Sequence, residues 1–158
     1  MTAGAAGYSG APLPRKLGFK SGMAAAFVAL PENLEDLVSS VEFSACDRFP
    51  SWEAIAKGNK VYDAIHAFTI MRAEIADELS GLQDRIVPDG MIWVSWPKKA
   101  SKVKTDVTED VVRNAALGLD LVDVKVAAID EIWSGLKLVI RQNRRKDRRK
   151  ERTDRSHG

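Results

Sequence analysis

The chain has 158 residues, of which 45% are hydrophobic and 29% charged, so it is long enough for one domain with a sizeable core. Its single cysteine, Cys46, excludes an intramolecular disulfide, and its longest apolar run, Met23 to Leu30, is too short to span a membrane. The N-terminus has no signal-peptide core, so we expect a cytoplasmic protein without membrane contact.

The net charge of +2 is unevenly distributed. Residues 141–158 hold nine Lys or Arg against three Asp or Glu, a local charge of +6, which leaves −4 for residues 1–140. This basic tail lacks apolar residues, so we expect it to be disordered. The expected organisation is a flexible arm over residues 1–16, one domain over residues 17–141 and the tail over residues 142–158.

Glycine and proline dominate the arm, and hydrophobic patterning begins after it. Along the first half of the domain, the patterns predict a buried strand, a short helix, a second strand, an irregular connection and a third strand, at residues 23–30, 32–40, 41–46, 47–60 and 61–68. A longer helix follows, because apolar residues recur at spacings of four, four, three and four, at Met71, Ile75, Leu79, Leu82 and Ile86.

The apolar run from Met91 to Trp96 predicts the central strand of the sheet. Asp89-Gly90 predicts a tight turn before it, because glycine takes positive φ without steric cost, and Pro97 ends it.

The last third of the domain predicts a helix and a hairpin. Asp106 and Glu109 have the spacing of a capping box, and that helix ends at Gly118. Residues 121–126 alternate apolar with charged side chains, which indicates a strand with one wet face. A turn at residues 133–135 separates it from a final strand at residues 136–140.

Several short motifs carry a family resemblance. Strand–helix alternation, Val-Pro-Asp-Gly at residues 87–90 and the final hairpin together resemble a shortened S-adenosylmethionine (SAM) methyltransferase fold over residues 15–141. The motifs at residues 7–10, 96–99, 106–109, 121–125 and 133–137 resemble a family of short bacterial proteins known as a domain of unknown function.

The resemblance implies an α/β, three-layer Rossmann-like sandwich. Its mostly parallel six-stranded sheet would have the order 2-1-3-4-6-5, with the last strand antiparallel and residues 121–129 at the edge.

The turn after the first strand departs from the pattern of methyltransferases. The resemblance would imply a glycine-rich cofactor loop at this position. Here the residues are Leu30-Pro31-Glu32-Asn33, with no glycine and one amide donor fewer. We therefore predict no cofactor and no SAM binding. Glu32 and Asp47 remain as acids that could hold ribose hydroxyls, although acids at loop starts are ordinarily just solvated.

The residues that usually carry catalysis do not form a recognisable set. No Gly-x-Ser-x-Gly elbow surrounds a serine, which argues against a hydrolase triad. His66 lies in an apolar strand and is interpreted as a hydrogen-bonded core residue, and Cys46 as a small buried hydrophobe. Two histidines and one cysteine at unrelated spacings predict no metal site.

Topology suggests where a ligand would bind, because parallel strands present their carboxyl ends at one edge of the sheet. In the predicted order, Trp96 and Trp133 come close together and offer two rings to a small planar or anionic ligand. The alternative is that the rings simply pack and the lysines are solvated. The full candidate set is Trp96, Lys98, Lys99, Trp133, Ser134, Thr69 and Arg72.

Three functions remain open. The first is a noncatalytic ligand-binding or interaction module, which the missing glycine loop favours. The second is a small-molecule enzyme, a divergent SAM-dependent methyltransferase, that uses the same edge. The third is nonspecific contact with RNA through the tail, for which the candidate residues are Arg144, Arg145, Lys146, Arg148, Arg149 and Lys150.

Overall fold

A six-stranded sheet forms the centre of the computed structural model, which describes the backbone of residues 12–157 and the side chains of residues 12–150. Its order is β2-β1-β3-β4-β6-β5, as predicted. The first four strands in this order are parallel, and β6 is antiparallel to both of its neighbours. The strands are β1 (Ala24–Val28), β2 (Ala45–Phe49), β3 (Tyr62–Phe68), β4 (Ile86–Pro97), β5 (Leu121–Ala128) and β6 (Trp133–Ile140).

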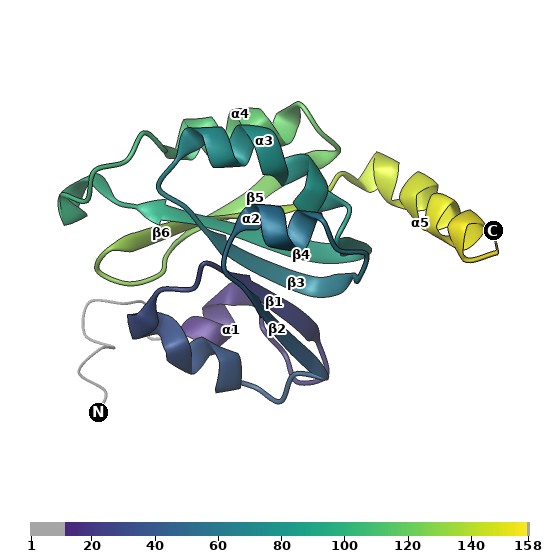
Figure 1. The fold of residues 1–158 in the computed structure, drawn as a ribbon, viewed down its shortest axis with the longest axis horizontal. Coiled ribbons are helices and arrows are strands. Elements are labelled where there is room, and N and C mark those ends of the chain that lie inside the picture. Colours follow the sequence, from purple (N-terminus) through teal and green to yellow (C-terminus); the bar gives the residue numbers. More distant parts are fainter. Residues whose placement is uncertain (1–11, 158) are drawn as a thin grey trace.

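Helices cover both faces of the sheet, so the α/β sandwich is confirmed (Figure 1). On one face lie α2 (Trp52–Ala56), α3 (Arg72–Gln83) and α4 (Glu109–Leu117). The other face is covered by the five-residue helix α1 (Leu13–Leu17) and the 3₁₀ helix η2 (Glu32–Ser39). A further 3₁₀ turn, η3 (Lys99–Ser101), follows β4.

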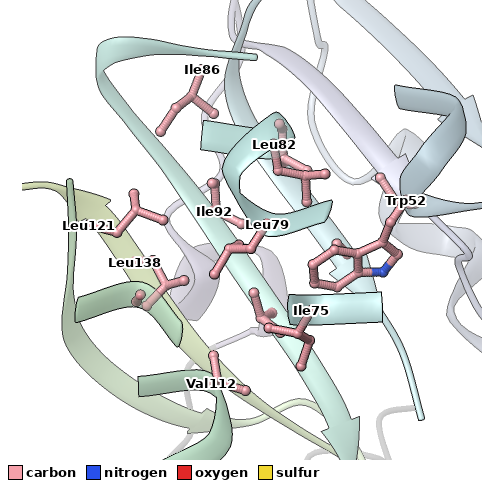
Figure 2. Close-up of a cluster of buried hydrophobic side chains, with 14 of the residues drawn as sticks. Trp52, Ile75, Leu79, Leu82, Ile86, Ile92, Val112, Leu121 and Leu138 are labelled. Atoms are coloured by element: carbon pink, nitrogen blue, oxygen red, sulfur yellow. The ribbon is translucent and has the colours of Figure 1, made fainter. Parts of the chain in front are cut away.

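The larger core lies under α3, whose predicted apolar stripe is confirmed at Ile75, Leu79 and Leu82, whereas Met71 is exposed ahead of the helix and Ile86 begins β4. Ile75, Leu79 and Leu82 are buried against Ile92 on the central strand (Figure 2). Trp52 on α2 closes one side of this core, and its indole Nε1 donates to the Phe68 carbonyl at 2.9 Å. The hydrogen bond satisfies the one polar atom of a fully buried ring.

The smaller core lies on the opposite face and is centred on Trp93. Its indole Nε1 donates to the Leu17 carbonyl at 2.9 Å and thereby fixes α1 to the central strand. Part of the predicted flexible arm, from Leu13 onwards, is therefore helical. Residues 1–11 lie outside the described part of the chain.

Glycine at position 90 is required for space and not for a turn. Val87–Gly90 belongs to β4, where the pairing with β3 shifts register between Tyr62 and Ala64. A Cβ atom on Gly90 would lie 3.0 Å from the carbonyl oxygens of Asp63 and Val87. The positive φ values among described glycines are at Gly18 and Gly22, so the predicted reason for this glycine is wrong.

Other boundaries also differ from the predicted ones. The turn predicted at residues 133–135 belongs to β6, where Gly135 fits against Ser95 and Trp93. Helix α2 lies within the predicted irregular connection. The predicted capping box is wrong in detail, because Thr108 caps α4 by accepting from the Val111 amide at 3.2 Å. Asp106 instead accepts from the Arg72 amide at the start of α3, at 2.7 Å.

The basic tail forms α5 (Gln142–His157), where the sequence predicted disorder. Arg148 accounts for much of this difference, because its guanidinium donates to Asp84 at 2.7 Å and to Asp120 at 2.9 Å. Burial raises the pKa of the Asp120 carboxyl, but hydrogen bonds from Arg144 and Arg148 outweigh that effect and hold the pKa below its ordinary value. The helix therefore docks through ion pairs and not through apolar burial. No helix within residues 12–157 is long and apolar enough to cross a membrane.

Candidate ligand-binding site

Trp96 and Trp133, which were predicted to form one ligand-binding site, lie on opposite faces of the sheet. Strands β4 and β6 are neighbours as predicted, but Trp96 pairs with Ser134, and Trp133 pairs with Pro97. Successive side chains of a strand alternate between faces, so this offset of one residue separates the rings. Trp96 is buried under the α3 layer, whereas Trp133 packs edge-on against Phe68 at 5.2 Å on the other face.

The two lysines and the serine of the candidate set lie beside these strand ends. Lys98 and Lys99 are at the surface, and the Lys98 amide donates to the Ile132 carbonyl at 2.8 Å. Ser134 is half-buried on β6. Their role in binding an anion stays a prediction.

Thr69 and Arg72 are occupied with the start of α3. The buried Thr69 hydroxyl donates to Glu74 at 2.6 Å and accepts from the Met71 amide at 3.1 Å. Arg72 lines a groove between α3 and α4, of about 560 Å³, together with Asp110 and Asn114. Thr69 directly follows Phe68, the ring that Trp133 contacts, but its hydroxyl is already used at the start of α3, and Arg72 lines a different groove.

A separate pocket of about 300 Å³ opens where β1 and β2 end. It is lined by Phe27, Ala29, Leu30, Arg48, Phe49 and Pro50. Five of these residues are apolar or aromatic and one is a cation, which is a common composition for a small-molecule site. Its volume is at the lower end of the range of roughly 300 to 1,000 Å³ for such sites.

Ala29 shapes the floor of this pocket by an uncommon backbone conformation. Its φ is +55°, in the left-handed region that favours glycine, and its amide donates to the Phe49 carbonyl at 2.8 Å. The chain thus makes the tight turn after β1 with an alanine in place of a glycine. Strained backbone of this kind is concentrated at functional sites.

Arg48 forms the outer wall of the pocket. Its guanidinium makes a two-point contact with the Glu35 carboxylate, with the second of the two bonds at 2.8 Å, and so links β2 to η2. Such paired hydrogen bonds hold an arginine in one orientation. Glu32 lies exposed in the first turn of η2, two residues beyond the pocket-lining Leu30.

Asp47, the other predicted ribose-holding acid, is engaged elsewhere. Its carboxylate accepts from Lys60 at 2.7 Å and from the Tyr62 hydroxyl at 2.6 Å, and these hydrogen bonds lower its pKa. Burial and the same bond raise the pKa of Tyr62 well above its ordinary value. Asp47 is not one of the residues that line the pocket.

His66 is a core residue, as interpreted from the sequence. It is fully buried, stacks on Phe68 at 4.2 Å, and its Nε2 lies 2.8 Å from the Ser95 hydroxyl. Burial lowers the pKa of His66 to about 3, so the ring is neutral at physiological pH. No hydrogen-bond partner for its Nδ1 is present among the described residues. An unmatched acceptor costs less than an unmatched donor, which favours the tautomer with the proton on Nε2.

Cys46 differs from its interpretation as a buried hydrophobe, because it is exposed on the edge strand β2. Partial burial and the neighbouring Asp47 raise the pKa of its thiol, which keeps it protonated. Within the described side chains, no group of three His, Cys, Asp or Glu residues is arranged to hold a metal ion.

The comparisons with known proteins support the fold and not a family. No protein-family model matches the chain, and no curated protein matches its sequence. Solved structures do match. The magnesium protoporphyrin IX methyltransferase of Synechocystis PCC 6803 with bound SAH superimposes with a TM-score of 0.56 and 9% identity, over 76% of this chain and 75% of that chain.

Two further solved structures also superimpose on this chain at low sequence identity. The ribosomal protein L11 methylase of Lactobacillus delbrueckii subsp. bulgaricus has a TM-score of 0.56 and 11% identity, over 76% of this chain and 70% of its own. The CcbJ methyltransferase of Streptomyces caelestis has a TM-score of 0.55 and 7% identity, over 84% and 91%. At these identities, the comparisons show a methyltransferase-like fold.

The prediction that SAM is not a ligand is wrong as an inference from the sequence. The structures that share this fold include proteins crystallised with SAM or with SAH. The absence of glycine at residues 30–33 does not mean that the tight turn is absent. Ala29 makes that turn one residue earlier.

Proposed function

We propose that this protein is a noncatalytic ligand-binding module of the methyltransferase-like fold, and that its pocket takes an adenosine-containing ligand of the SAM type. One observation carries the proposal. The pocket of about 300 Å³ opens at the carboxyl ends of β1 and β2, the edge at which open α/β sheets bind ligands. Among the apolar lining residues, Leu30 is half-buried and Pro50 is exposed, so these two supply the apolar surface for a planar base.

The charges around the pocket support distinct roles for two residues. Arg48 presents a guanidinium to the carboxylate of a methionine-type group, at the cost of part of its contact with Glu35. Glu32 is the acid that we assign to the ribose hydroxyls, because the carboxylate of Asp47 already accepts from Lys60 and Tyr62.

The proposal of a noncatalytic role rests on the chemistry of the lining residues. Arg48 is the one ionisable side chain among them, and a guanidinium does not take up or release a proton at neutral pH. Histidine is the residue that most often acts as a general base, but His66 is buried and neutral in the core and does not line the pocket. Membership of the family of short bacterial proteins and a cytoplasmic location belong to the same proposal, on the motifs and composition given above.

Calorimetric titration of the full chain with SAM and with SAH tests this function. We expect saturable binding that Leu30→Trp abolishes by filling the pocket, whereas Leu117→Trp, on the exposed face of α4, leaves it unchanged. Glu32→Gln should weaken binding about tenfold, the equivalent of about 1.4 kcal/mol. Asp47→Asn should leave the binding affinity unchanged. Absence of heat with both ligands would contradict the proposal.

The alternative, a divergent methyltransferase, is distinguished by turnover. The protein is incubated with SAM and an extract of small molecules, and SAH is measured by mass spectrometry. SAH formation above that of the Leu30→Trp variant would replace the noncatalytic module with an enzyme that uses the same pocket.

Contact with RNA is a second candidate function, and the docking of α5 favours it. Arg144 and Arg148 contact Asp120, which fixes one side of the helix against the domain. Lys146 and Lys150 remain exposed on the helix. A docked helix with exposed cations presents its charges in a fixed row, which suits a chain of phosphates.

A further inference from the structure

Two lysines lie opposite each other on the sheet face that α1 covers, and the charge of a third, Lys20, acts on one of them. Lys125 on the edge strand β5 lies directly opposite Lys137 on β6, and Lys137 lies opposite the core residue Trp93. Opposite residues of antiparallel strands share a face, so both lysines project toward the α1 side. Lys20 follows α1 in the chain, and burial together with the charges of Lys125 and Lys20 lowers the pKa of Lys137.

This arrangement breaks a rule of sheet construction. Like charges directly opposite each other on neighbouring strands destabilise the sheet. None of the three lysines forms an ion pair with a carboxylate among the described side chains, although other lysines and arginines of the domain do, such as Lys57, Lys60 and Arg113. Such local violations are expected at functional sites.

The frame that holds the lysines is well fixed. Lys125 Nζ donates to the Lys16 carbonyl at 3.0 Å, and Lys16 Nζ donates to the Ala128 carbonyl at 3.1 Å. Trp93 holds the same end of α1 through the Leu17 carbonyl. The end of α1 and the edge of the sheet are therefore joined from both sides, so the backbone positions that carry the lysines are fixed relative to one another.

We propose that Lys20, Lys125 and Lys137 form a binding site for consecutive phosphate groups, as present in an RNA backbone or in inorganic polyphosphate. Phosphates supply the negative charge that the protein itself does not place there, and lysine binds them as a mobile point charge. Lys20 and Lys125 are exposed and accessible to a ligand, and Lys137 is half-buried beneath them. The site lies on the β5–β6 side of the sheet, apart from the β1–β2 pocket, and does not depend on the function of that pocket.

Fluorescence anisotropy with two labelled probes tests the site, a single-stranded RNA oligonucleotide and an inorganic polyphosphate. The full-length chain is compared with the Lys125→Met, Lys137→Met double variant across a range of salt concentrations. Binding should weaken, and the slope of log K against log salt should fall by about 1.4 if both lysines contact a single strand, at about 0.7 per contact. A Lys102→Met, Lys104→Met variant removes the same charge elsewhere on the surface and should bind like the native chain.

Thermal unfolding separates lost binding from lost structure. Removing the opposed charges should leave the melting temperature of the double variant unchanged or raise it. If the melting temperature of the double variant falls instead, Lys137→Arg serves as the second test, because it keeps the charge and should therefore retain binding. Weaker binding of one probe alone identifies the source of the phosphates. Native affinity of the double variant for both probes, or no binding of either probe by the native chain, overturns the proposal.

Discussion

Ala29 is the residue at which the backbone leaves the conformations that alanine ordinarily adopts. The left-handed region costs an L-residue roughly 1 to 2 kcal/mol, and glycine avoids this cost but loses roughly 0.5 to 1 kcal/mol in chain entropy on folding. We therefore expect Ala29→Gly to raise the free energy of unfolding by about 0.5 kcal/mol.

The matched control for this change is Ala25→Gly, on the strand β1 that Ala29 follows. Ala25 is buried and is not among the described residues with positive φ, so glycine there should destabilise the protein by about 1 kcal/mol or more. Urea unfolding of both variants measures the difference. An equal loss of stability in both would show that the φ of Ala29 carries no strain.

His66 makes the stability of the domain depend on pH. Its folded pKa of about 3 lies below the ordinary value of 6.5, so the unfolded chain binds more protons between these values. The contribution of His66 should therefore be constant above about pH 7, and stability should fall by about 2 kcal/mol between pH 8 and pH 5. The lowered pKa values of Asp47 and Asp120 act below this window, because unfolded aspartates are still ionised at pH 5.

The control for this prediction is His66→Phe, which keeps an aromatic ring beside Phe68 and removes the titrating group. Urea unfolding of this variant at pH 5 and pH 8 should give nearly equal free energies. A native chain that is equally stable at both pH values would mean that His66 can be protonated in the folded state.

Single residues were predictable where their environment follows from their own strand. The burial of His66 and Trp93 follows from the apolar runs around them. Their partners were not predictable, because Ser95 and Leu17 come from other parts of the chain. The same limit applies to Trp96 and Trp133. Their strands were correctly predicted to be neighbours, but a register difference of one residue places the rings on opposite faces.

At the scale of elements, α5 shows what local pattern alone misses. Its sequence has too little apolar surface to fold by burial. The acids that dock it, Asp84 and Asp120, lie on other elements and come together only in the folded domain. The candidate pocket has the same origin, since β1 and β2 are joined in space by the turn at Ala29.

Docking of α5 predicts a measurable contribution to stability. The Arg148 side chain is 13% exposed and Asp120 is 21% exposed, so this pair is less screened than an ordinary surface ion pair. We expect Arg148→Met to lower the free energy of unfolding by about 1 to 2 kcal/mol.

Lys146→Met removes an exposed charge from the same helix and should change stability by less than about 0.5 kcal/mol. Chemical unfolding of both variants at low and high salt tests the assignment, because salt should weaken the Arg148 contribution. If Arg148→Met and Lys146→Met behave alike, α5 does not dock as the structure describes.

At the scale of the whole molecule, positive charge is segregated from the rest of the chain. Residues 141–158 carry +6 against −4 for the remainder, so this segment attracts phosphates more strongly than the rest of the chain does on average. For the RNA candidate function, we expect Lys146→Gln with Lys150→Gln to weaken binding of a single-stranded RNA. The slope of log K against log salt should fall by about 0.7 for each lysine that contacts a phosphate.

The two lysines are exposed and do not dock α5, so the double variant should unfold like the native chain. Truncation of the helix would not be a clean test, because it would also remove the docking contacts of Arg148. Anisotropy measured beside a Lys102→Gln, Lys104→Gln variant separates position from total charge. Equal weakening in both variants would mean that RNA responds to net charge alone and that the row of cations on α5 is not a binding surface.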